Sequence, residues 1–164
     1  MTTRKIATYG MMVALALIMS YIEAQIPAFV AVPGMKLGLT NIVVVVALYL
    51  IGPKSAMFIN VIRIILVSLL FGNTMSFAFS IAGGMISTVV MLFLKKIDRF
   101  GVIGVSAAGG ISHNIGQILV AMVLLHTSAI AWYLPILWIS GIVSGIVIGV
   151  ISGIVTNRLK TISL

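Results

Sequence analysis

Arg63 is a charged side chain in the middle of a long apolar run, and it is the residue that most strongly suggests ligand binding. Asn60 precedes it by three residues, so the two share a face if the run is helical. A guanidinium among apolar residues is costly unless oxygen atoms surround it. Two interpretations remain open: Arg63 forms a structural pair with Glu23, or it binds an anionic or carbonyl-bearing ligand.

A second polar cluster contains Ser112, His113, Asn114 and Gln117, again inside an apolar run. One buried histidine often serves as a single hydrogen bond between helices, and that alternative remains open here. Four polar residues within six positions favour a cavity lining instead, because buried amides need partners.

The third element is the segment PGMKLGLTN at positions 33–41, followed at a similar depth by Asn73. Its glycines and proline permit a turn, and Lys36 supplies a base. Basic and amide donors with few acids favour ligands that carry phosphate, carboxylate or carbonyl oxygens. We therefore predict one polar pocket, open to the outside, lined by Lys36, Asn41, Asn60, Arg63, Asn73, His113, Asn114 and Gln117.

The residue inventory argues against most catalytic chemistry. The chain has two acidic residues and no cysteine, so it cannot build an aspartate-rich magnesium site or a thiolate metal site. It has no P-loop motif, and two histidines thirteen residues apart do not provide a haem site. We expect no catalytic residue, no metal and no cofactor, and hence no enzyme.

The amino-acid composition indicates the class of protein in which these polar residues lie. Hydrophobic residues make up 62% of the 164 positions and charged residues 7%, and the mean hydropathy is +1.31. A soluble domain of this size needs more charge to cover its surface. The sequence therefore predicts an all-α integral membrane protein whose outer surface faces lipid.

Apolar runs separated by glycine, proline and charged residues predict six transmembrane helices in one domain covering 1–164. Their bounds are about 6–26, 37–51, 55–71, 75–94, 102–125 and 131–155. If six spans alternate, eight bases lie on one side and only Lys36 on the other. The positive-inside rule then places both termini in the cytoplasm of a prokaryotic cell, with the protein in the plasma membrane. Because the bases are dispersed, we expect no nucleic-acid partner.

Small residues repeat at intervals of four along two of these spans. Gly141, Gly145, Gly149 and Gly153 form such a stripe in the last span, and Gly10 with Ala14 forms a shorter one in the first. Stripes of this kind allow another helix backbone to approach closely. They predict internal packing or contact with a separate subunit, and both interpretations remain open.

Five segments together carry a family resemblance: MVALALIMSYIE (12–23), PGMKLGLTNI (33–42), RIILVSLLFG (63–72), FSIAGGMIS (79–87) and GGISHNIGQILVA (109–121). On these the chain resembles the Gx transporter family, whose members are commonly labelled heptaprenyl diphosphate synthase component I. That family is similar to the S components of energy-coupling factor (ECF) transporters, which are six-helix membrane proteins.

The resemblance implies capture of a vitamin-like or isoprenoid- or quinone-related small molecule from the outer side. It also implies transport driven by a transmembrane coupling protein and ATPases. Two alternatives remain: a non-catalytic membrane subunit of heptaprenyl diphosphate or menaquinone metabolism, and a quinone- or flavin-binding component of electron transfer.

Overall fold

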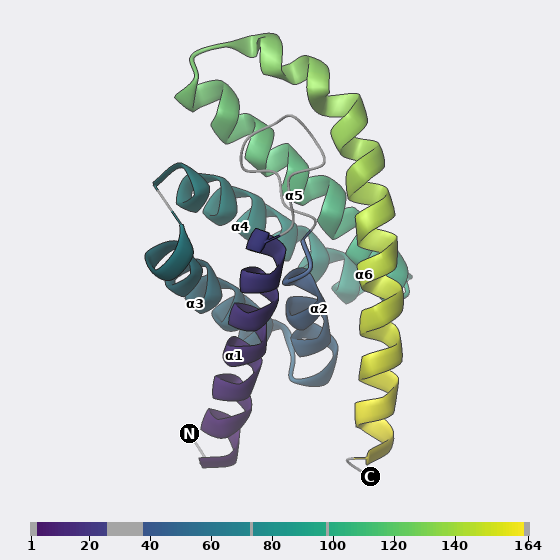
Figure 1. Ribbon diagram of the computed structural model, residues 1–164. Coiled ribbons are helices and arrows are strands. Elements are labelled where there is room, and N and C mark those ends of the chain that lie inside the picture. The colour runs from purple at the N-terminus through teal and green to yellow at the C-terminus, as the bar shows by residue number, and fades with distance from the viewer. Residues whose placement is uncertain (1–2, 26–37, 73, 98, 163–164) are drawn as a thin grey trace.

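The computed structural model describes residues 3–25, 38–72, 74–97 and 99–162, and within these ranges all regular structure is helical (Figure 1). The elements are α1 (Thr3–Gln25), α2 (Asn41–Leu50), α3 (Pro53–Phe71), α4 (Thr74–Ile97), α5 (Val102–Leu124), the 3₁₀ helix η1 (Ser128–Tyr133) and α6 (Leu134–Ile162). The expected all-α architecture is confirmed.

Five helices are long and apolar enough to cross a membrane, whereas α2 is not. The expected span at 37–51 forms a helix of only ten residues, about 15 Å long, against roughly 30 Å of bilayer hydrocarbon. Gly38 adopts a φ of +79°, so the chain turns there and the helix begins later than the apolar run suggested. Gly52, with a φ of +124°, and Pro53 end α2 and begin α3.

The short helix α2 forms the centre of the apolar core. Every residue from 43 to 48 is buried, and α2 packs against α1, α3 and α6. Its C-terminal end is stabilised by Lys95 of α4, whose Nζ donates to the Leu48 carbonyl and lies 4.7 Å from the Tyr49 ring centroid. A helix with no outward face can be short because its neighbours separate it from lipid.

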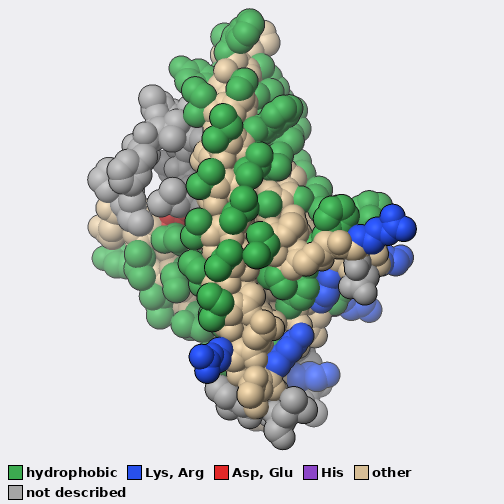
Figure 2. Space-filling model, turned by 90° about the vertical axis from the view of Figure 1, so that its right-hand side faces the viewer, with side chains coloured by type: hydrophobic (Ala, Val, Ile, Leu, Met, Phe, Trp, Pro, Cys, Tyr) green, Lys and Arg blue, Asp and Glu red, His purple; other side chains and the backbone are tan. Residues whose placement is uncertain are grey.

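The outer surface is that of a membrane protein. Large apolar side chains are exposed along α3, α4, α5 and α6. Figure 2 shows hydrophobic side chains covering much of one face of the molecule from its upper end downward. Lys and Arg side chains lie lower on that face. In Figure 1, α1 begins and α6 ends at the lower end, while the α5–η1–α6 connection lies at the upper end. The chain is therefore a multi-pass membrane protein.

The glycine stripe of α6 packs inside the molecule for most of its length. A Cβ added to Gly110 of α5 would lie 2.2 Å from the Gly141 carbonyl oxygen. Added to Gly145 or Gly149, it would lie 2.6 or 2.7 Å from an α5 backbone atom. These three α6 glycines therefore let α5 and α6 meet backbone to backbone.

The remaining small residues behave differently. A Cβ added to Gly153 or Gly10 would meet nothing within 4 Å, and Ala14 is exposed. A partner interface at Gly10 and Ala14 stays a prediction.

Candidate functional site

Arg63 lies in the middle of α3 and is 9% exposed. Its Nε donates to Asn60 Oδ1 at 2.8 Å, and its Nη2 donates to Asn41 Oδ1, on α2, at 3.1 Å. Two neutral amide oxygens thus hold the guanidinium from two helices. Its charge is not cancelled by these contacts.

Asn60 connects this guanidinium to α4. Its Nδ2 donates to the Gly84 carbonyl at 3.0 Å and to Thr88 Oγ1 at 2.7 Å. The approach of α3 to α4 depends on Gly84, because an added Cβ there would lie 2.7 Å from Ile64 Cδ1 and 3.3 Å from Asn60 Nδ2. A continuous hydrogen-bond chain therefore runs from α4 through Asn60 and Arg63 to α2.

Glu23 of α1 is buried and binds the segment that begins α2. Its carboxylate accepts hydrogen bonds from the Gly38 backbone N–H and from the Thr40 hydroxyl, the latter at 3.3 Å. Ser20 Oγ lies 2.8 Å from the same hydroxyl oxygen. A carboxylate here also faces the positive end of the α2 dipole. Of the described residues, Arg63 and Glu23 make no ion pair, so the structural pair left open above is not formed.

Both charged groups nevertheless face one cavity, which we call the Arg63 cavity. It has a volume of about 20 Å³, enough for roughly one water molecule. Residues from α1 to α5 line it: Ser20, Glu23, Gly38, Thr40, Asn41, Arg63, Ile64, Val67, Ser80, His113 and Gln117.

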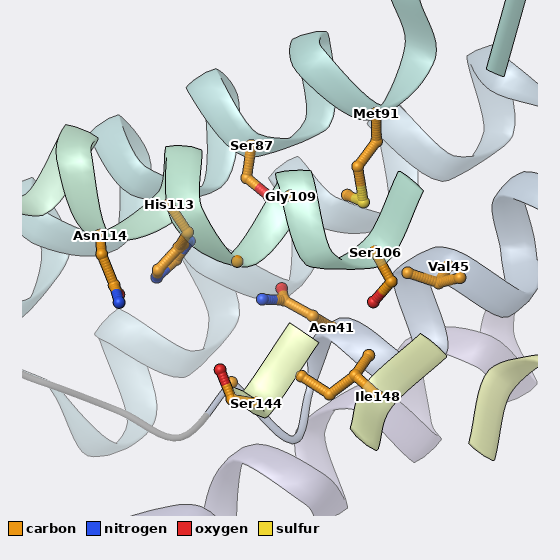
Figure 3. A pocket seen from close by; sticks show the side chains of 12 residues that line it. Asn41, Val45, Ser87, Met91, Ser106, Gly109, His113, Asn114, Ser144 and Ile148 are labelled. Atoms are coloured by element: carbon orange, nitrogen blue, oxygen red, sulfur yellow. The ribbon is translucent and has the colours of Figure 1, made fainter. Parts of the chain in front are cut away.

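A second, smaller hollow adjoins it, which we call the Ser87 cavity (Figure 3). Its volume is about 10 Å³, and it shares Gly38, Asn41 and His113 with the Arg63 cavity. Figure 3 shows the Asn41 side chain reaching into it between α5 and α6. Ser87 is 2% exposed, and its Oγ has no hydrogen-bond partner among the described residues. The hollow beside this hydroxyl has a volume close to that of one water molecule.

His113 reaches both cavities because α4 has a glycine opposite it. A Cβ on Gly83 would lie 2.9 Å from the His113 carbonyl oxygen and 3.0 Å from the His113 ring. On the same side of α5, a Cβ on Gly116 would lie 2.8 Å from the Gly83 Cα. The two glycines thus bring α5 against α4 and place the imidazole, itself 9% exposed, at the cavity wall.

The structure brings together four of the eight residues that the sequence singled out for the pocket: Asn41, Arg63, His113 and Gln117 line the Arg63 cavity. Asn60 lies behind Arg63 and supports it. Asn114 lines only the Ser87 cavity and donates to the Leu137 carbonyl of α6 at 2.7 Å. The other two, Lys36 and Asn73, lie outside the described residues.

Sequence reasoning missed several small hydroxyls of these walls, namely Ser20, Ser80, Ser87, Ser106 and Ser144. A serine in an apolar helix gives little signal, because its hydroxyl can bond the preceding turn of its own helix. Within the described ranges, no group of three or more histidine, aspartate or glutamate side chains could hold a metal ion. The site is thus a neutral-amide and hydroxyl lining around one buried cation and one buried anion.

Comparison with known families gives a match over most of the chain. The family model described as heptaprenyl diphosphate synthase component I matches residues 12–155. Searches of the curated proteins and of the solved structures gave no match.

Proposed function

The chain belongs to the heptaprenyl diphosphate synthase component I family, and we propose that it binds a small anionic or carbonyl-bearing molecule as the substrate-binding component of a transporter. The supporting observation is the buried Arg63 guanidinium, which faces a polar cavity and is held by amides and not by a carboxylate. A buried cation without an ion pair is costly, so its retention favours a binding role.

We propose further that the protein is not an enzyme, despite the word synthase in the family description. Prenyl diphosphate synthesis needs carboxylates that hold magnesium on the diphosphate. Glu23, the one acid among the described residues, is already bonded to the beginning of α2. The polar site therefore supports binding, and its described residues lack the set of carboxylates that would hold magnesium on a diphosphate.

Our proposed topology has five membrane-crossing helices and the short α2, which passes through part of the bilayer inside the bundle, with both termini in the cytoplasm and the protein in the prokaryotic plasma membrane. Two observations support it: α1 begins and α6 ends at the same end of the molecule, and Lys and Arg lie away from the α5–α6 connection. In this orientation the exposed Trp132 of η1, 86% accessible, lies at the outer interface. Six helices with this orientation are similar to an ECF S component.

Transport needs a source of energy, and the chain has no nucleotide-binding motif. We propose that a transmembrane coupling protein with ATPases supplies it. The exposed face of α1 with Gly10 and Ala14 is the proposed contact, because another helix can approach closely there.

Ligand binding requires the site to open. The Arg63 cavity holds about one water, whereas sites for drug-sized ligands are roughly 300 Å³ or larger. We therefore propose that the site is closed here and that side chains of the lining move when a ligand enters.

Mass spectrometry of small molecules that co-purify with the protein tests this function. We expect wild type to retain a molecule that Arg63→Gln loses. Arg158→Gln, which removes an exposed arginine of α6 outside the site, is the matched control and should retain it. Equal ligand content in wild type and Arg63→Gln would refute the proposal.

The family description favours one second candidate, a non-catalytic membrane subunit that binds a heptaprenyl diphosphate synthase. This role predicts co-purification of a soluble prenyltransferase from the native membrane. It also predicts that Arg63→Gln leaves that association intact, because the guanidinium is buried away from any partner surface.

A further inference from the structure

We infer that the Arg63 cavity selects a head group with a single negative charge, a carboxylate, and rejects a diphosphate. The inference rests on the proposed function and narrows its ligand class. It follows from the charges that face the cavity, from the donors that Arg63 has left, and from the position of Asn41.

The cavity wall carries one positive and one negative side chain among its described residues, Arg63 and Glu23. The other polar side chains on the wall are the hydroxyls of Ser20, Thr40 and Ser80, the amides of Asn41 and Gln117, and the imidazole of His113. Glu23 stays in place because the Gly38 N–H and the Thr40 hydroxyl hold its two oxygens. Of the described residues, an incoming anion therefore meets one guanidinium and one fixed carboxylate.

Arg63 still has donors to offer. A guanidinium has five N–H groups, and the hydrogen bonds of Arg63 use Nε and Nη2. Nη1 has no acceptor among the described residues, although the side chain is more than nine-tenths buried. A carboxylate matches this geometry, because its two oxygens can accept from Nη1 and Nη2 in parallel.

The charges on the cavity wall limit how much negative charge the head group of the ligand can carry. Arg63 and Glu23 carry opposite charges, so a carboxylate brings one negative charge to a wall whose described residues are neutral overall, and Arg63 can hold it through two parallel hydrogen bonds. A diphosphate carries several negative charges, and those beyond the first would be buried beside the Glu23 carboxylate, where charges of like sign repel strongly.

The position of Asn41 indicates where the head group of the ligand would bind. Its Oδ1 accepts the hydrogen bond from Arg63 Nη2 that an oxygen of the ligand carboxylate would accept instead. The same side chain also lines the Ser87 cavity (Figure 3), where the Ser87 hydroxyl has no partner among the described residues. Asn41 can therefore leave Arg63 by turning toward a polar space that already exists.

Three probes with the same tail test the charge rule: geranic acid, geraniol and geranyl diphosphate. Binding to the full-length protein in lipid nanodiscs is measured by titration, following the unfolding temperature and tryptophan fluorescence. We expect geranate to bind and Arg63→Gln to weaken it about tenfold or more, the typical effect of a lost bond to a charged group. Geraniol and geranyl diphosphate should bind at least tenfold more weakly than geranate.

Two further variants keep the guanidinium and thus remain informative if Arg63→Gln does not fold. Asn41→Ala removes the competing acceptor and should bind geranate at least as tightly as wild type. Glu23→Gln removes the repelling charge and should reduce the preference for geranate over geranyl diphosphate.

The results separate the inference from the proposed function. Geranyl diphosphate binding as tightly as geranate, or no binding of geranate, would overturn the inference. The proposed function would still stand if a co-purifying molecule depended on Arg63, and would fall if none did.

Discussion

Replacing Asn60 by alanine should be among the most destabilising single changes in the polar interior. Asn60 makes three hydrogen bonds, two as donor to α4 and one as acceptor from Arg63. The Gly84 carbonyl keeps a second donor in the variant, because the Thr88 hydroxyl bonds it at 2.7 Å. The main cost is thus the Arg63 Nε–H, which loses its acceptor while remaining buried.

The magnitude follows from these contacts. Loss of a hydrogen bond to a charged group costs about 1.5–3 kcal/mol, and neutral side-chain bonds within a membrane average about 0.6 kcal/mol each. We therefore expect Asn60→Ala to lower the free energy of unfolding by about 3 kcal/mol. Asn60→Asp keeps an acceptor for Arg63 and adds an opposite charge, which offsets much of the loss of the two donor bonds and the contact of its second oxygen with the Gly84 carbonyl, so it should cost about 1 kcal/mol.

Unfolding in mixed micelles by titration with sodium dodecyl sulfate, followed by tryptophan fluorescence, measures these differences. The matched control is Asn157→Ala, since Asn157 is exposed on α6, and its effect should stay within about 0.5 kcal/mol. If Asn60→Ala and Asn60→Asp cost the same, the bond to Arg63 does not dominate and the reasoning is refuted.

Other predictions test the packing and the topology. Gly110→Ala should destabilise by about 2 kcal/mol in the same titration, because its Cβ would overlap the α6 backbone, whereas Gly153→Ala should be neutral or slightly stabilising. Lys95→Met should cost about 1 kcal/mol, since the C-terminal end of α2 loses its cation. The chain has no cysteine, so single-cysteine variants report topology directly. An impermeant maleimide should label Trp132→Cys on intact cells but Lys96→Cys only after permeabilisation, and the reverse pattern would contradict the proposed orientation.

Most helices could be predicted from the sequence because apolar runs in this chain end at glycine, proline or charged residues. The expected span at 55–71 corresponds to α3 and that at 102–125 to α5, with bounds that differ by two residues or fewer. The expected span at 37–51 was too long. Hydropathy detects the apolar run but not the left-handed turn at Gly38, which delays the helix to Asn41.

The sequence could single out several residues that share one cavity, but not their hydrogen-bond partners. Arg63, His113 and Gln117 attracted attention because each interrupts an apolar run, and all three line one cavity. The sequence offered Glu23 as the partner of Arg63, whereas the structure gives that place to Asn41. Which acceptor reaches a guanidinium depends on how helices are rotated and shifted against one another, and no local pattern contains that information.

The brevity of α2 also constrains how the protein is made. Ten residues are too few to enter a bilayer as an independent unit, and α2 packs against α6, which is synthesised after the other described helices. The Ser152 hydroxyl of α6 donates to the Ile42 carbonyl at 3.4 Å, in the first turn of α2. During translation α2 therefore lacks part of its packing surface until α6 has been synthesised.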